Sequence, residues 1–86
     1  MFYVYVLESQ ISGRIYIGFS DDVKRRLNEH NEGRSKSTKN RGPWTLMGFI
    51  ETKSRNEAMK LEKKLKSFKR KDRVLSYLKK HGKTFY

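Results

Sequence analysis

The sequence contains no cysteine, which excludes a disulfide framework, a thiolate metal site and any zinc finger. It has one proline and no apolar run near the roughly 18 residues that a membrane-spanning helix needs. The opening stretch, residues 1–7, is apolar, but it stops at Glu8 and lacks the basic start and small-residue cleavage site of a secretory signal. We therefore expect a cytoplasmic protein that stays out of membranes and is stabilised by packing alone.

Acidic residues are scarce. The chain has 21 Lys and Arg against nine Asp and Glu, a formal net charge of +12. The imbalance is uneven along the chain: residues 1–52 carry a net charge of +2, and residues 53–86 a net charge of +10. A field of this sign and strength attracts polyanions, so nucleic acid is the expected partner.

A length of 86 residues is close to the lower limit for one self-sufficient hydrophobic core. Only 35% of the residues are hydrophobic, but aromatic residues make up 13% of the chain and supply much apolar area per residue. We expect residues 1–86 to form a single domain, without internal repeats, and the protein to be a monomer.

Three segments have the composition of β-strands. Residues 2–7 and 14–19 are rich in aromatic and β-branched residues, and residues 10–13 between them have turn chemistry, which predicts a β-hairpin. Residues 44–51 return to the same composition. We expect this third strand to join the hairpin in one sheet.

Helical signals separate and follow these strands. Asp21 or Asp22 can cap a first helix that ends near residues 31–33. Residues 32–43 are almost entirely polar and basic, which predicts an exposed, mobile loop that faces the substrate. Ser54 is a predicted helix cap, since Glu57 follows it as in a capping box.

The helix predicted after Ser54 has an apolar face formed by Ala58, Leu61, Leu65 and Phe68. Asp72 can cap a last helix that ends at Gly82 and turns inward Val74, Leu75 and Leu78. The expected fold is therefore an α/β fold of the α+β type, a three-stranded antiparallel sheet flanked by helices in the order β-β-α-β-α-α.

Two aromatic triplets lie on the predicted hairpin. Residues 3–5 read Tyr-Val-Tyr and residues 16–18 read Tyr-Ile-Gly. On paired strands, Tyr5 and Tyr16 can face the same side and bring their hydroxyls together. Arg26 and His30 are four residues apart, so they project from one helix face and can join them.

Glu62 lies within the strongly basic helix that follows the third strand. The ordered set of two triplets, Arg26, His30, the basic loop with Pro43 and Trp44, and Glu62 resembles the GIY-YIG nuclease family, with Tyr3 where the signature has its first glycine. The likeness extends over nearly the whole chain. It is strongest to small stand-alone members related to the nuclease domain of the excision-repair protein UvrC.

The resemblance implies a metal-dependent endonuclease that hydrolyses phosphodiester bonds in DNA, as in repair or recombination. It implies one divalent ion, Mg²⁺ or Mn²⁺, held by Glu62, a carboxylate that suits a hard cation. Tyr5 would activate water, and Arg26 would stabilise the charge of the scissile phosphate. Tyr16 and His30 would orient water or phosphate, or relay a proton.

Nucleic acid, DNA rather than RNA, is expected to bind along the basic loop and the basic helix. The residues expected to contact it are Arg25, Lys36, Thr38, Lys39, Arg41, Lys63, Lys66, Lys69 and Arg70. Selection of a target would then come from these segments or from a partner protein.

Other interpretations of the same residues stay open. Tyr5 and Tyr16 can be hairpin packing, His30 a polar residue at a helix end, and Glu62 an ion-pair partner of Lys66. Arg25 adjoins Arg26 and could be the functional arginine instead. The basic run can also be a solvated helix surface.

At the level of the whole chain, two alternatives to a nuclease remain. Residues 74–77 lack the asparagine that larger GIY-YIG members carry after the metal-binding glutamate, so a non-catalytic nucleic-acid-binding module of the same fold is the main one. A basic protein of the ribosome or another RNA surface is the other, supported by size and charge alone.

Overall fold

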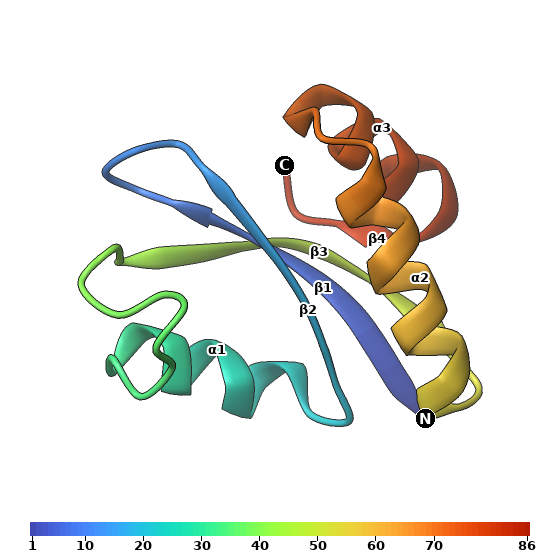
Figure 1. The fold of residues 1–86 in the computed structure, drawn as a ribbon, viewed down its shortest axis with the longest axis horizontal. Helices are drawn as coiled ribbons and strands as arrows, with labels where there is room; N and C mark the ends of the chain where they lie inside the picture. Colours follow the sequence, from blue (N-terminus) through green and yellow to red (C-terminus); the bar gives the residue numbers. More distant parts are fainter.

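One four-stranded sheet and three helices make up the fold. The computed structural model describes residues 1–86. The strands are β1 (Phe2–Ser9), β2 (Ile15–Ser20), β3 (Trp44–Thr52) and β4 (Lys83–Thr84). The helices are α1 (Val23–Asn31), α2 (Arg55–Ser67) and α3 (Lys71–His81), and Figure 1 shows their arrangement. The predicted α+β architecture is confirmed, with one more strand than the sequence indicated.

The strands lie in the order β2-β1-β3-β4, and every neighbouring pair is antiparallel. On the central strand β1, Tyr5 lies between Gly18 of β2 and Phe49 of β3. The hairpin predicted for β1 and β2 is confirmed, and β2 forms one edge of the sheet.

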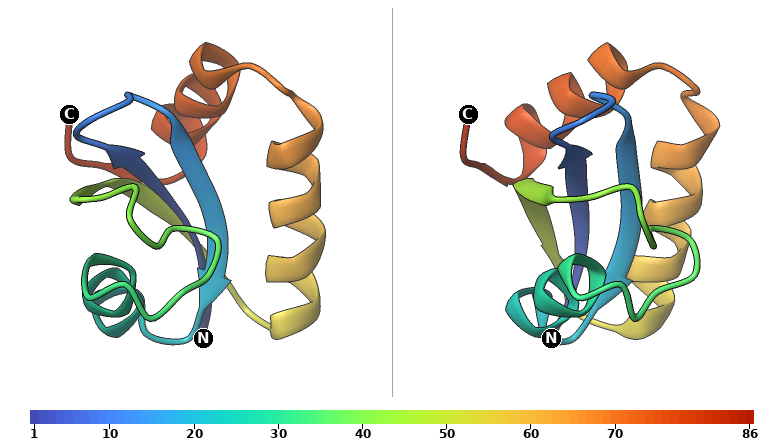
Figure 2. Two further views of the ribbon diagram at one scale, coloured as in Figure 1. Left: turned by 60° about the vertical axis from the view of Figure 1, so that its left-hand side comes forward. Right: turned by 90° about the vertical axis from the view of Figure 1, so that its left-hand side faces the viewer.

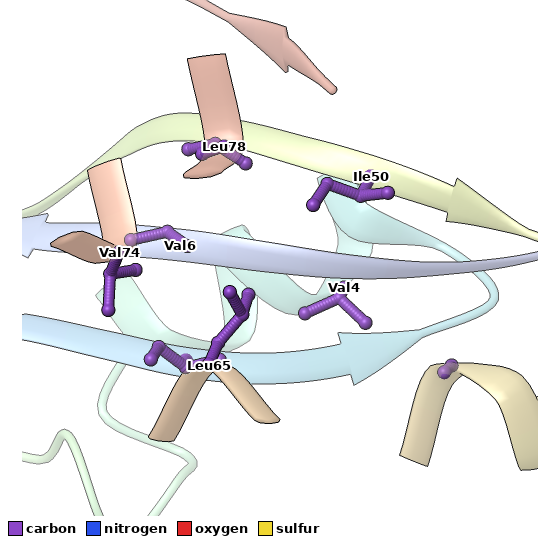
Figure 3. Packing of buried hydrophobic residues seen from close by; sticks show 8 residues of the cluster. Val4, Val6, Ile50, Leu65, Val74 and Leu78 are labelled. Atoms are coloured by element: carbon purple, nitrogen blue, oxygen red, sulfur yellow. The ribbon is translucent and has the colours of Figure 1, made fainter. Parts of the chain in front are cut away.

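Alternate residues of β1 enter two separate hydrophobic layers, as expected for a strand covered on both faces. Val4 and Val6 face α2 and α3, and Figure 3 shows them among Leu65, Val74 and Leu78. Tyr5 and Leu7 belong to a second cluster on the opposite face, together with residues of α1. Figure 2 shows α1 and α2 on opposite sides of the sheet, with β2 between them.

Two helices begin as the sequence predicted. The Asp22 carboxylate accepts a hydrogen bond from the backbone N–H of Arg25 at 3.0 Å, and caps α1. The Ser54 hydroxyl accepts one from the N–H of Glu57 at 3.2 Å, and caps α2. None of the three helices combines the length and the apolar character that a bilayer-spanning segment needs.

The prediction that Asp72 caps the last helix is wrong. The cap position of α3 is Arg70, which makes no side-chain capping bond, and Asp72 lies in the first turn. Its carboxylate accepts hydrogen bonds from the Arg70 guanidinium, with Nη2 at 2.9 Å. An acidic side chain is favoured by the helix dipole at either position, so the sequence signal did not distinguish them.

Strand β4 was not predicted, because a two-residue polar strand has no alternation to detect. It pairs with Gly48 and Phe49 of β3. A Cβ atom on Gly48 would overlap the carbonyl oxygen of Lys83, and one on Gly82 would overlap that of Phe49. The two glycines therefore allow the chain end to lie against β3.

Candidate active site

The Tyr5 ring lies directly against the backbone of Gly18. A Cβ atom on Gly18 would be 2.6 Å from the Tyr5 hydroxyl oxygen and 2.8 Å from its Cζ. Any side chain at residue 18 would therefore displace the Tyr5 hydroxyl. The sequence analysis gave Gly18 no role beyond its place in the Tyr-Ile-Gly triplet. A glycine inside a predicted strand often marks a position where another group packs closely against the backbone, and this could have indicated its role.

Tyr16 lies two residues before Gly18, on the same face of the hairpin as Tyr5. Its ring centroid is 6.3 Å from that of Tyr5, 4.8 Å from that of His30 and 6.4 Å from that of Trp44. The hairpin thus brings the two tyrosines together, as its spacing predicted. The Tyr16 ring is only partly covered, whereas the Tyr5 ring is buried beneath its neighbours.

His30 connects Tyr5 to the loop after α1. Its Nε2 is 2.9 Å from the Tyr5 hydroxyl oxygen, and its Nδ1 is 2.7 Å from the Thr38 hydroxyl oxygen. The side chain is 2% exposed. Burial, and then the charge of Arg26, lowers the pKa of His30 to about 4, so the imidazole is neutral at pH 7. His30 is therefore not a charged residue at a helix end, and both of its nitrogens are occupied.

Thr38 does not lie on the surface as predicted. It is 1% exposed, its hydroxyl bonds to His30, and its carbonyl oxygen accepts a hydrogen bond from the Trp44 indole at 3.2 Å. Since it has no exposed atoms to offer a phosphate, its role here is to hold His30. The loop is also less free than its composition predicted, because the Ser9 hydroxyl donates to the Arg41 carbonyl oxygen at 2.7 Å.

Of the two adjacent arginines, Arg26 lies beside Tyr5. Its guanidinium pairs with Glu29, with Nη1 to Oε1 at 2.5 Å, its positive charge lowers the pKa of the Tyr5 phenol, and its side chain is 29% exposed. Partial desolvation lowers the pKa of Arg26, but the interactions with Glu29 and Tyr5 outweigh it and the pKa is raised. The Arg25 side chain is 54% exposed and pairs with Asp21 at 3.2 Å.

Burial raises the pKa of the Tyr5 phenol above its ordinary value. The neighbouring Arg26 guanidinium lowers it, whereas ionisation of Tyr16 and the negative charge of Glu62 raise it. The sequence argument expected a cationic neighbour to lower this pKa, and Arg26 does so, but burial outweighs it. Tyr5 therefore carries its proton at neutral pH.

Glu62 reaches the same neighbourhood from α2. Its half-buried carboxylate pairs with Lys66 at 3.4 Å, and its charge contributes to the pKa of Tyr5. No group of three or more His, Asp or Glu side chains gathers into a ready-made metal cage. Mg²⁺ usually binds one or two carboxylates and completes its octahedron with water and phosphate oxygens. Glu62 fits a site of that open kind.

Comparison with known proteins decides the family. A family model described as the GIY-YIG catalytic domain matches residues 1–83. This chain belongs to the GIY-YIG family. Among its GIY-YIG relatives, a UPF0213 protein of Streptococcus agalactiae is 42% identical over 80 residues, covering 92% of this chain and 89% of that protein. The solution NMR structure of a UPF0213 protein from Bacillus halodurans has a TM-score of 0.54 and 36% identity, and the match covers 90% of this chain and 85% of that one.

Another relative of this chain has a name that describes a nuclease. The structure-specific endonuclease subunit SLX1 of Homo sapiens is 37% identical over 51 residues, which covers 55% of this chain and 18% of that protein. Together with the family match, this likeness supports a nuclease-type GIY-YIG domain. It covers a small part of SLX1, so it concerns the domain and not that whole protein.

All the basic residues predicted to bind nucleic acid lie on the surface of this GIY-YIG domain, and Thr38, the one uncharged residue of the predicted set, is buried. The exposed ones are Arg25, Lys36, Lys39, Arg41, Lys63, Lys66, Lys69 and Arg70. Arg25, Lys66 and Arg70 make ion pairs within the chain. The five others have no acidic partner, so their charges are available to phosphates. They lie on the loop after α1 and on or just after α2.

Proposed function

We propose that this chain is an endonuclease that hydrolyses phosphodiester bonds in DNA, with one divalent ion, Mg²⁺ or Mn²⁺, held by Glu62. The observation that carries the proposal is the Tyr5 hydroxyl, held 2.9 Å from Nε2 of the neutral His30, with the partly exposed Arg26 guanidinium close enough to lower the pKa of the phenol. A partly exposed cation beside an oriented hydroxyl suits phosphoryl chemistry. Membership of a catalytic-domain family and the likeness to SLX1 support the same function.

Each side chain has a role that follows from its position. The Arg26 guanidinium binds the scissile phosphate and stabilises its growing negative charge. When Nε2 of His30 carries no proton, the Tyr5 hydroxyl donates to it, and because Tyr5 is 1% exposed, its oxygen can accept a hydrogen bond from the attacking water only once substrate binding uncovers it. Tyr16, beside His30, orients water or phosphate. A divalent ion, when bound, supplies positive charge to the phosphate and lowers the pKa of a bound water.

Cleavage assays with matched arginine variants test this assignment. Purified protein would be incubated with supercoiled plasmid and with branched and single-stranded oligonucleotides, in Mg²⁺, Mn²⁺ or EDTA. We expect Arg26→Ala to lower the cleavage rate by about 100-fold or more, since it removes a charge-stabilising donor. Arg25→Ala, which removes an equal charge from the next residue, should retain most of the activity. An Arg26→Ala protein that cuts like the wild type would rule out the proposed role.

Glu62→Ala tests the metal site and excludes a contaminating nuclease. Cutting that needs the divalent ion and is lost in Glu62→Ala supports the enzyme. If wild type and variant bind DNA equally and neither cuts, the alternative holds, and the domain is a nucleic-acid-binding module.

The choice of substrate in the cell is a further part of the proposal. SLX1 is named as a subunit of its endonuclease. We propose that this domain is directed to DNA by a partner protein in addition to its own basic surface. Pull-down of one defined protein that restricts cleavage to one DNA structure would support this arrangement.

A further inference from the structure

Glu29 forms the shortest ion pair of the candidate site, and its partner is the arginine assigned to the phosphate. Its Oε1 lies 2.5 Å from Nη1 of Arg26, which precedes it by three residues on α1, so the two side chains project from the same side of the helix. Only 24% of the Glu29 side chain and 29% of the Arg26 side chain are exposed. Solvent therefore screens this pair less than it screens the exposed pair of Arg34 and Glu32.

The place of Glu29 is fixed by its neighbours. The next residue, His30, is buried with both ring nitrogens bonded to hydroxyl groups. The second carboxylate oxygen of Glu29, Oε2, lies 3.7 Å from Nε of Arg25. The hydrogen bond from Arg26 lowers the pKa of Glu29, so the carboxylate is ionised at neutral pH. A fixed negative charge thus holds one end of the Arg26 guanidinium.

The Arg26 guanidinium has more donors than this pair uses. Glu29 takes Nη1, whereas Nε and Nη2 of Arg26 form no ion pair with a carboxylate of the chain. The N–H groups of Nε and Nη2 lie along one edge of the planar group, and two parallel donors match two oxygens of a phosphate. The ion pair therefore leaves free an edge that a phosphodiester can bind through two hydrogen bonds.

Charge alone does not account for a carboxylate at this position. The chain has nine acidic residues against 21 basic ones, and an acid beside the phosphate-binding arginine weakens the attraction of the site for DNA. An arginine side chain has many rotamers, however, and at a partly exposed position it needs a partner to hold one of them. What Glu29 adds to the site is therefore geometry.

We propose that Glu29 is a positioning residue, which holds the Arg26 guanidinium through Nη1 and presents its Nε–Nη2 edge to the scissile phosphate. The proposal rests on the proposed nuclease function and adds a residue to its site. Glu29 acts through Arg26 without touching the DNA. Its removal would leave the charge of Arg26 in place but would free the guanidinium to turn, so the transition state would lose more stabilisation than the bound substrate.

Side-chain NMR tests the orientation without any cleavage. The Nε–Hε signal of Arg26 in isotope-labelled protein would be assigned by its absence in Arg26→Lys, and its heteronuclear NOE and chemical shift would be measured in EDTA with and without a duplex oligonucleotide. We expect an ordered signal in the wild type that shifts when the DNA is added. In Glu29→Ala the NOE should fall and the shift should be smaller. The backbone spectrum shows at the same time that the variant is folded.

Glu32→Ala is the matched control, because it removes an equal charge from the C-cap of the same helix, where Glu32 pairs with Arg34 and not with Arg26. Its Arg26 signal should behave as in the wild type. Loss of a negative charge should leave the affinity for DNA in EDTA unchanged or higher in Glu29→Ala and in Glu32→Ala alike. A lower rate of cleavage in Glu29→Ala would then not be explained by weaker binding.

Single-turnover cleavage in Mg²⁺ shows whether the orientation serves the reaction. The rate should fall by about tenfold to 100-fold in Glu29→Ala, since a small displacement of a positioned group has effects of that size. Glu32→Ala should stay within about twofold of the wild type, as expected for an exposed pair. Glu29→Gln, which keeps an oxygen to accept from Nη1, should recover part of the rate lost in Glu29→Ala.

The outcomes separate this proposal from the nuclease function. If the protein cuts DNA and Glu29→Ala cuts as fast as the wild type or faster, or if the Arg26 signal is equally ordered without Glu29, the positioning role is overturned while the nuclease function stands. If no form of the protein cuts DNA but the DNA-induced shift of Arg26 is lost in Glu29→Ala and kept in Glu32→Ala, the nuclease function fails, and Glu29 is established as the residue that orients Arg26 toward phosphate.

Discussion

His30 is held between two hydroxyl groups in the interior of the α1 layer. Tyr5 and Thr38 occupy its two nitrogens, and Thr38 in turn receives the Trp44 indole N–H. No buried side-chain nitrogen or oxygen of the chain lacks a hydrogen-bond partner. A fully satisfied buried network of this kind fixes the orientation of each member, and here it fixes the direction of the Tyr5 hydroxyl.

The neutral state of His30 makes stability depend on pH. Its pKa is about 4 in the folded protein, against an ordinary value of 6.5, so between these values the unfolded chain binds a proton that the folded protein does not. Stability should therefore fall as the pH is lowered from about 6.5 to about 4, by as much as about 3 kcal/mol. Urea unfolding at pH 7.5, 5.5 and 4.5 would measure the loss.

A histidine variant isolates the residue responsible. His30→Asn should be less stable at pH 7.5 but should lose much less stability down to pH 4.5. His81→Asn, at an exposed position of α3, should keep the wild-type dependence. The same pH dependence in wild type and His30→Asn would show that another group is responsible. Glu29, whose pKa is lowered by Arg26, contributes only below its ordinary value of 4.5.

Single residues of the site differed in how well the sequence predicted them. The resemblance to the GIY-YIG family selected Tyr5, Tyr16, Arg26 and His30, and strand pairing and helix periodicity predicted that they would lie close together. The burial of Thr38 could not be predicted, since it lies in a loop that is otherwise polar and exposed. The packing of the Tyr5 ring against Gly18 could not be predicted either, because it depends on the register of the β1–β2 hairpin, which pairs these two residues.

At the scale of elements, α2 contributes residues both to the hydrophobic core and to the candidate site. Leu65 of this helix is fully buried in the core, and Glu62, one turn earlier on the same side, is partly buried and raises the pKa of Tyr5. The packing of the apolar face therefore sets the position of the carboxylate. Damage to that face should affect both stability and activity.

Two substitutions on α2 test how much its buried face and its exposed face each contribute to stability. Leu65→Ala should lower the free energy of unfolding by about 2–5 kcal/mol, the cost of a cavity in a packed core. Met59→Ala, at a side chain that is 46% exposed on the same helix, should change it by less than about 0.5 kcal/mol. Urea denaturation of both variants would measure the difference. Equal losses would mean that the helix does not pack as described.

Elements with periodic patterns were predictable, and those without were not. The hairpin and the third strand follow from aromatic and β-branched composition between turn residues, and α2 follows from apolar residues at helical spacing. The sequence did not reveal β4, since two polar residues form a strand only because Gly48 and Gly82 let the backbones approach. The start of α3 was misplaced by two residues, because Asp72 is equally suitable for the cap and for the first turn.

At the scale of the whole molecule, the positive field comes from both sides of the open edge of the sheet. The loop after α1 supplies Lys36, Lys39 and Arg41, and α2 and its continuation supply Lys63 and Lys69, all exposed. Figure 1 shows α1 and α2 well apart, with the sheet between them. A nucleic acid lying along β2 would meet cations from each of these segments.

The salt dependence of binding should report how many of these charges touch phosphates. The logarithm of the affinity for duplex DNA should fall linearly with the logarithm of salt concentration, with a slope of about −0.9 for each phosphate neutralised. A Lys36→Ala, Lys63→Ala double variant should make the slope less negative by about 1.8, if each residue binds one phosphate. Anisotropy titrations at KCl concentrations from about 50 to about 300 mM would measure the slope. An unchanged slope would remove both residues from the interface.

The central strand β1 takes part in both hydrophobic layers, with Val4 and Val6 in one and Tyr5 and Leu7 in the other. This has a consequence for genetic screens of the protein. Most substitutions in residues 2–9 would reduce the amount of folded protein in the cell, and a colony assay would score them as inactive whatever their chemistry. Inactive alleles in β1 therefore identify catalytic residues only after activity is divided by protein abundance, whereas alleles at the partly exposed Arg26 can be interpreted more directly.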